Sequence, residues 1–443
     1  MGTATRARGA AAASAGGRSG NGSGSGSNAV RPRTPASTML RTESLTSRVG
    51  PFQLQQLVLI ELALAVLVVA AAIDKLMLAP AVVVAVALVL LALMRRHQRS
   101  VRDWLSTLLA LRARKRLAAA PLRERVDASL APAVEAVPGL RTYAFLDRDR
   151  RTIGMLGDGS FLTAVVRVEA GVSALRPAFG ARALPLGLLH EALDVDGIAL
   201  ESVQIVQHVQ PAPAPHLPEQ SVARRSYGPL QEQTGSPALR LTWVALKLDP
   251  ELCSEAVKAR GGGLEGAQRC LVRAADQLAS RVTGAGFRAT VLNEDELISA
   301  VATSACVNPM ATARASQPDA PPTRRTQETP RAWRCDDRWH TTYAVGRWPE
   351  LGRAATPLPR LVSRLTSMPT LTTTFSLTVG RGARRQSLSV SGHVRVTGRT
   401  DAELSGARRQ LERDARSAKV GLVRLDREQL PGALATLPLG GTR

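Results

Sequence analysis

The side chains able to do chemistry are spread along the chain and form no recognisable active-site pattern. The six histidines show no i, i+4 pair of the kind that places two metal ligands on one helix face; they are His97, His190, His208, His216, His340 and His393. The four cysteines lie far apart and lack C-x-x-C spacing; they are Cys253, Cys270, Cys306 and Cys335. We expect reduced, mostly buried thiols and no metal site.

Asp336, Asp337 and His340 come closest to a hydrolase pattern, but they lie at a loop-to-strand boundary with no nucleophile in register. The chain also lacks the G-x-S-x-G, G-x-x-x-x-G-K-[ST] and kinase motifs. Gly261-Gly262-Gly263 precedes a helix, without the lysine or serine that a phosphate loop needs. We therefore predict no catalytic, cofactor-binding or metal residues, no cofactor and no enzyme.

Two glycine-containing segments are interpreted as turns. Gly154, Gly157 and Gly159 precede a strand, whereas a dinucleotide loop must precede a helix, so hairpin turns are the better interpretation. The basic segment Gly380–Arg385 lies between two predicted strands, Leu371–Val379 and Ser387–Thr397. It is expected to be an exposed turn, although its cations would also suit an acidic protein or lipid.

The chain has 443 residues, so more than one domain is expected. Its 58 Lys and Arg residues exceed its 36 Asp and Glu residues, which gives a formal net charge of +22. This excludes an acidic activation-type protein, but the cations are nearly all arginine, as GC-rich coding favours. With only three tyrosines and six phenylalanines for base stacking, nucleic-acid binding is not expected.

The first 50 residues contain seven arginines, one acid and a Gly-Ser repeat. Such a segment cannot bury apolar area, so residues 1–50 are predicted to be a disordered basic tail. A transit peptide is the alternative that its composition leaves open.

Two apolar runs follow, Leu57–Ile73 and Leu76–Met94, separated by Asp74-Lys75. As helices they would reach about 25 and 28 Å, close to the hydrocarbon thickness of a bilayer. Residues 51–96 are therefore predicted to form a transmembrane helical hairpin. The cations that follow the second run favour cytoplasmic termini and a multi-pass cell-membrane protein. Glu61 lies in the first run and is expected to reach the interface or to contact a partner helix.

Val101, Trp104, Leu105 and Leu108 have helical spacing and are followed by a cluster of cations. We expect a helix that continues the second span, with residues 97–140 forming a basic juxtamembrane helix and linker. A helix lying on the lipid surface is the alternative. Anionic lipid is the partner that this cluster predicts.

The rest of the chain is predicted to be an α/β (α+β) region with an internal repeat. Leu264–Thr303 aligns without a gap with Thr397–Thr436, at an offset of 133 residues. Each copy is expected to run strand, helix, strand, helix, and Asn293 and Asp426 are the predicted N-caps of equivalent helices. This order favours two ferredoxin-like β-α-β-α units packed as a pseudo-dimer.

The predicted boundaries follow from this repeat. Residues 141–307 form a cytoplasmic α/β subdomain with the first repeat, and residues 333–443 form one with the second. Residues 308–332 are rich in proline and poor in apolar side chains, so a disordered linker is expected between them.

In order and spacing, the chain resembles the EccE family, a membrane component of the type VII (ESX) secretion machinery of high-GC Gram-positive bacteria. The resemblance rests on Arg48–Met94, on the basic stretch Arg95–Arg116, and on Tyr143–Val168, where Ile153-Gly154 and Gly157-Asp158-Gly159-Ser160 precede Phe161. No single motif is specific. The tail before Arg48 and the stretch 308–330 fall outside the expected pattern.

The resemblance implies a non-catalytic scaffold subunit that assembles with EccB, EccC and EccD and supports protein export. EccC would be the ATPase, and no nucleotide site is visible in this chain. It also implies no nucleic-acid partner and no small-molecule substrate. Two alternative functions remain open. The first is a membrane-anchored enzyme such as a transferase, and the second is a membrane-tethered regulatory or nucleic-acid-binding protein.

Overall fold

The computed structural model describes a defined part of the chain. The described residues are 54–73, 80–86, 95–96, 99–119, 126–171, 183–211, 220–222, 225–226, 229, 237, 239–321, 323–350, 357–382 and 387–441. All of them lie in the second of two units, Met1–Met39 and Leu40–Arg443. The predicted basic tail, residues 1–50, lies outside the described residues.

The first half of the folded region begins with the short helix α4 (Ala131–Ala136). Its main strands are β3 (Arg141–Leu146), β4 (Thr152–Gly157), β5 (Leu162–Ala170), β8 (Ser202–Gln210), β9 (Leu239–Leu248) and β10 (Phe287–Val291). Its helices are α5 (Leu186–Glu191), α7 (Ser254–Ala259), α8 (Gly263–Gly284) and α9 (Glu294–Ser304), with a 3-10 turn η2 (Pro250–Cys253). A small hairpin joins β6 (Asp194–Val195) to β7 (Ile198–Ala199).

The second half follows the same sequence of main elements, without counterparts of β6, β7, η2 and α7. Its strands are β11 (Thr326–Glu328), β12 (Trp333–Cys335), β13 (Arg338–Arg347), β14 (Thr372–Arg381), β15 (Leu388–Gly398) and β16 (Gly421–Arg424). Its helices are α10 (Pro309–Ala315), α11 (Leu358–Thr366), α12 (Asp401–Ser417) and α13 (Gln429–Leu434).

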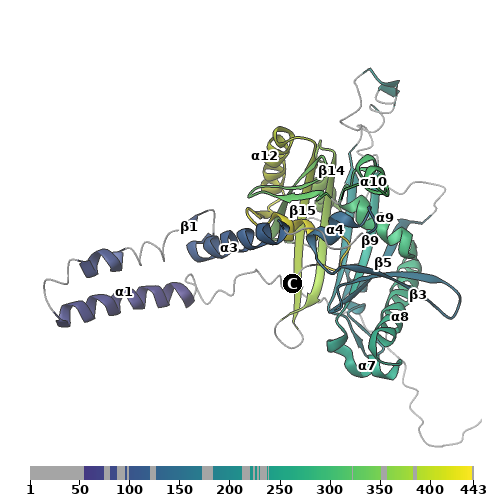
Figure 1. The fold of residues 1–443 in the computed structure, drawn as a ribbon, viewed down its shortest axis with the longest axis horizontal. Helices are drawn as coiled ribbons and strands as arrows, with labels where there is room; N and C mark the ends of the chain where they lie inside the picture. The colour runs from purple at the N-terminus through teal and green to yellow at the C-terminus, as the bar shows by residue number, and fades with distance from the viewer. Residues whose placement is uncertain are drawn as a thin grey trace, which may run out of the picture. The chain divides into compact units, whose positions relative to one another are not determined.

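Apart from the small β6-β7 hairpin, the strands of both halves belong to one antiparallel sheet of 12 strands (Figure 1). Its order is β11-β12-β13-β15-β14-β8-β9-β5-β4-β3, while β10 pairs with β5 and β16 pairs with β13. The order reads outward from the β14-β8 pair in the same way in both directions, because β8 corresponds to β14, β9 to β15 and β5 to β13. The two halves are thus related by an approximate two-fold pattern.

The two halves meet where β8 pairs with β14, in a contact that we call the seam. The register runs from Thr373 opposite Val209 to Gly380 opposite Ser202. Antiparallel pairing over this length satisfies the backbone groups that would otherwise form an open sheet edge in each half.

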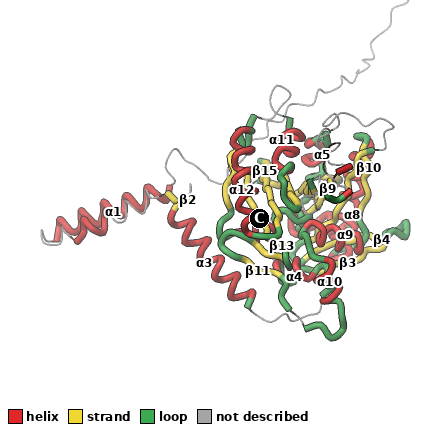
Figure 2. The backbone as a smooth tube through the Cα atoms, turned by 90° about the horizontal axis from the view of Figure 1, so that it is seen from above, coloured by secondary structure: helices red, strands yellow, loops and turns green. Residues whose placement is uncertain are grey.

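Side chains of both faces of the sheet are buried, because helices cover each face. On β5, Val166 packs in a core with α5 and α8, whereas its neighbour Val165 packs on the opposite face with α4 and α9. The core under α11 and α12 contains strand residues such as Val394 and Val396. In Figure 2, α5 and α11 lie on one side of the strands and α4 lies on the other.

The predicted fold class, a transmembrane hairpin followed by two ferredoxin-like repeats, is corrected by this architecture. The structure is a mixed α and β fold built on a single 12-stranded antiparallel sheet. The physical reason is the seam, which joins the edge strands of the two halves by hydrogen bonds. The aligned segments, Leu264–Thr303 and Thr397–Thr436, cover α8-β10-α9 and, after the end of β15, α12-β16-α13.

The predicted membrane hairpin and multi-pass localisation are also corrected. The helix α1 (Leu54–Ile73) covers the first apolar run, but in the second run only residues 80–86 are described as helical, and residues 74–79 and 87–94 lie outside the described residues. Over the described ranges, no helix is both long and apolar enough to cross a bilayer.

Two further local expectations differ from the structure. The helix α3 (Val101–Ala118) does not continue the second apolar run, because the pair β1 (Arg95–Arg96) and β2 (Arg99–Ser100) precedes it. The stretch 308–332, expected to be a disordered linker, instead contains α10 and β11. The other predicted boundaries stay predictions.

The last described residues, 435–441, cross the seam on the sheet face opposite α8, and we call them the C-terminal strap. Ser202 Oγ on β8 donates to the Gly440 carbonyl at 2.6 Å. Gln204 donates to the Ala435 carbonyl at 2.8 Å and accepts from the Gly440 N–H at 2.9 Å. Side chains of the sheet therefore bind the strap through its backbone.

We predict that Gly440→Ala destabilises the fold by about 1–3 kcal/mol. Gly440 has a φ of +90°, and an added Cβ would lie 2.5 Å from Cβ of Lys247. The measurement is urea-induced unfolding, followed by circular dichroism.

The matched control is Gly406→Ala within α12, where an added Cβ meets nothing within 4 Å. This change should stabilise the protein by about 0.5–1 kcal/mol, because alanine favours a helix interior over glycine. Equal changes in the free energy of unfolding for the two substitutions would show that the strap does not require the close approach of Gly440 to Lys247.

Candidate functional site

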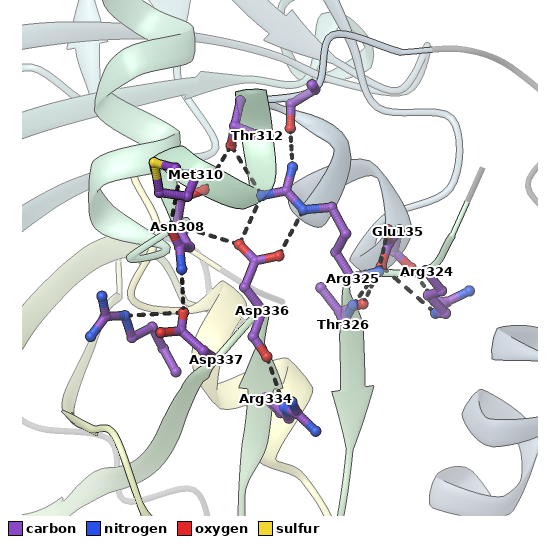
Figure 3. A network of polar contacts seen from close by, with 12 residues as sticks. Glu135, Asn308, Met310, Thr312, Arg324, Arg325, Thr326, Arg334, Asp336 and Asp337 are labelled. Atoms are coloured by element: carbon purple, nitrogen blue, oxygen red, sulfur yellow. Dashed lines mark hydrogen bonds and ion pairs between the residues drawn. The ribbon is translucent and has the colours of Figure 1, made fainter. Parts of the chain in front are cut away.

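A network of polar side chains closes the end of the sheet at β11 (Figure 3). At its centre is Arg325, just before β11, which forms a two-pronged ion pair with Asp336. Nε donates to Oδ1 at 2.7 Å and Nη2 donates to Oδ2 at 2.8 Å. The two side chains are only 7% and 5% exposed, so the pair is buried.

The remaining donors of Arg325 are also used. Nη1 donates to the Ala128 carbonyl, and Nη2 also donates to Thr312 Oγ1 at 3.0 Å. Burial acts to lower the pKa of Arg325, but the hydrogen bonds and the charge of Asp336 outweigh it and raise that pKa. The guanidinium is therefore held charged and fixed in orientation.

Glu135, on α4, caps the free edge of β11. Its carboxylate accepts from the backbone N–H of Arg325 at 2.9 Å, from the N–H of Thr326 at 2.8 Å and from Thr326 Oγ1 at 2.7 Å. Arg324 donates to the Glu135 carbonyl at 2.7 Å. An edge strand with unpaired donors is prone to pair with another strand, and here a buried carboxylate occupies those donors.

The helix α3 is tied to the same end of the sheet. Arg114 makes an ion pair with Glu328 on β11, with Nε 2.8 Å from Oε2, and it also donates to the Arg427 carbonyl at 2.6 Å. Glu328 in turn accepts from the Leu430 N–H at 3.0 Å. Glu328 therefore connects α3 to β11 and α13.

The three residues of the hydrolase-like pattern all have structural partners. Besides its pairing with Arg325, Asp336 accepts from the Asn308 N–H at 2.9 Å, and Asp337 accepts from Asn308 Nδ2 at 2.9 Å. His340 is fully buried, and its Nδ1 lies 3.0 Å from Thr397 Oγ1. Burial, followed by nearby Arg395, holds the pKa of His340 well below its usual value, so the ring is neutral. Among the described residues, Asp336 and Asp337 contact Arg325 and Asn308, whereas His340 contacts Thr397, so the three side chains do not share one centre.

The other motifs noted in the sequence also have local roles. Gly261, Gly262 and Gly263 all have positive φ and lead into α8. In the basic segment, Arg381 donates to the carbonyls of Leu200 and Leu193, whereas residues 383–386 lie outside the described residues.

Two further expectations concerned Glu61 and metal binding. Glu61 is exposed on α1. Among the described side chains, no group of three His, Cys, Asp or Glu residues is placed to hold a metal ion.

Sequence reasoning also missed Arg395 on β15, a fully buried cation. Its Nη2 donates to the Ser304 carbonyl at the end of α9. On the seam, His208 Nδ1 lies 3.0 Å from Thr374 Oγ1, and burial, followed by Arg395, lowers the pKa of His208 to about 3. In the sequence, Arg395 stands between Val394 and Val396. This alternation of polar and apolar residues is typical of a strand with one exposed face, so it gave no sign that Arg395 is buried.

The fold and the network thus define a mixed α and β protein whose conspicuous polar groups hold elements together. Comparison with known families gives a match over residues 236–345 to the model described as "Putative type VII ESX secretion system translocon, EccE". The match covers about a quarter of the chain, from β9 into β13, and includes Arg325 and Asp336. No curated protein matches the chain.

The resemblance to the EccE family is therefore confirmed over residues 236–345. The segments that suggested it, Arg48–Met94, Arg95–Arg116 and Tyr143–Val168, lie outside the match. The family domain indicates a component of the type VII secretion system that associates with other components of that system.

We predict that Arg325→Ala lowers the free energy of unfolding by about 3–5 kcal/mol, because it leaves the Asp336 carboxylate buried without its partner. The measurement is chemical denaturation at neutral pH. The free energy of unfolding of Arg325→Lys should lie between those of the unmodified protein and Arg325→Ala, because lysine restores the charge without the two-pronged geometry.

The matched control is Arg151→Ala. Arg151 pairs with Asp276 at 2.9 Å, but the two side chains are 47% and 36% exposed. An exposed pair contributes about 0–1 kcal/mol. If Arg325→Ala lowered the free energy of unfolding no more than Arg151→Ala does, the structural role of the network would be contradicted.

Proposed function

We propose that the chain is a non-catalytic structural subunit of a type VII secretion complex, where it stabilises the assembly and supports protein export. The observation that carries the proposal is the EccE match over residues 236–345. It is supported by the partners of Asp336, Asp337 and His340, which are all structural.

The partners that we propose are the other subunits that accompany EccE in this machinery, namely EccB, EccC and EccD. EccC would provide ATP hydrolysis. This chain would provide surfaces of fixed shape, since the main strands of both halves belong to one sheet.

A second partner class is proposed for α3. Arg112, Lys115 and Arg116 are exposed near its end, while Arg114 on the same turn is fixed to Glu328. A helix held in place at one residue presents its other cations in a defined orientation. These cations suit anionic lipid headgroups.

We expect deletion of the chain to lower the yield of the larger assembly and to block export. The assembly can be isolated through a tagged partner subunit, and its chains can be quantified by mass spectrometry, alongside secreted protein in the medium.

Asp337→Ala and Glu61→Ala should leave both readouts nearly unchanged, because these acids lie on exposed positions and serve no reaction in this account. Loss of export in either variant, with the assembly intact, would replace the structural role with a catalytic or ion-coupled one.

A further inference from the structure

A cavity of about 420 Å³ lies beside the network, between α10, the loop that precedes β11, and β12. Its ionisable lining consists of four arginines and a single acid: Arg314, Arg324, Arg325, Arg334 and Asp336. The rest of the wall includes small apolar residues such as Ala315 and Pro321. This volume is within the range of sites that hold small ligands and short peptide segments.

The charges of the cavity are not balanced among the residues that the structure describes. Asp336 is already paired with Arg325 at 2.7 Å. Arg324 lies 3.9 Å from the Glu135 carboxylate and donates to the carbonyls of Glu135 and Ala118. No carboxylate among the described residues pairs with Arg314 or Arg334.

The two unpaired arginines differ in how they are held. Arg334 Nε donates to the Asp336 carbonyl at 2.7 Å, and its guanidinium lies over the Trp339 ring at 5.6 Å, so its Nη atoms remain available in a fixed orientation. Arg314 is exposed on α10 and has no described polar partner for its side chain. One cation is therefore oriented in advance, and the other is free to adjust to a ligand.

We propose that this cavity binds an acidic peptide segment, with carboxylates paired to Arg314 and Arg334 and small side chains against Ala315 and Pro321. Guanidinium groups match carboxylates in geometry. A nucleotide fits less well, because the wall contains no lysine, no glycine-rich run of N–H donors and no free aromatic ring for stacking. The site goes beyond the proposed structural role and does not depend on it.

The test is fluorescence anisotropy with the full chain and a labelled eight-residue peptide of alternating glutamate and alanine. We expect saturable binding that weakens as salt rises, and binding at least about tenfold weaker for the same peptide with glutamine in place of glutamate. Arg314→Glu should weaken binding of the acidic peptide by about tenfold or more, whereas Arg314→Lys should retain most of it.

The matched control is Arg409→Glu, which reverses an exposed arginine on α12, away from the cavity. It makes the same change in net charge and should leave the affinity within about twofold. Equal losses at Arg314 and Arg409 would reduce the effect to non-specific charge and overturn the proposal. So would equal binding of the glutamine peptide, or displacement of the labelled acidic peptide by inorganic phosphate or ATP at lower concentrations than the unlabelled acidic peptide requires.

Discussion

The β8–β14 pairing is the interaction on which the rest of the structure depends. It turns two similar arrangements of strands and helices into a single antiparallel sheet, with a continuous register from Thr373–Val209 to Gly380–Ser202. Side chains reinforce it from one face, where Ser376 and Gln204, on the two paired strands, both donate to the Ala435 carbonyl of the C-terminal strap. The strap is thus hydrogen-bonded to both strands of the seam. Separating the two halves would break these side-chain bonds as well as the backbone bonds between β8 and β14.

The seam also determines where the network lies. Strands added outward from β8 and β14 bring β3 to one end of the sheet and β11 to the other. The β11 end is the one closed by Glu135 and joined to α3 through Arg114. The EccE match runs from β9 into β13 and so includes strands of both halves, while the two strands of the seam, β8 and β14, lie outside it.

Local signals in the sequence predicted single elements well. The helix expected to start after the N-cap Asn293 is α9, because Asn293 and Glu296 form a complete capping box that fixes its start. The equivalent cap at Asp426 does not form: Arg427 adopts a φ of +67°, and α13 begins only at Gln429. The network was not predictable in this way, because Arg325 and Glu135 are 190 residues apart and neither carries a local pattern. The membrane hairpin was inferred from apolar length alone, a signal that does not distinguish a span from other apolar helices.

The central claim is that the two halves form one cooperative unit through the seam. Hydrogen exchange measured by mass spectrometry at increasing denaturant tests it most directly, because it gives an opening free energy for each strand. The account predicts that peptides covering β8, β9, β14 and β15 lose protection together, at the free energy of global unfolding. If β14 and β15 opened at a clearly lower free energy while β8 and β9 stayed protected, the halves would be independent and the claim would be wrong.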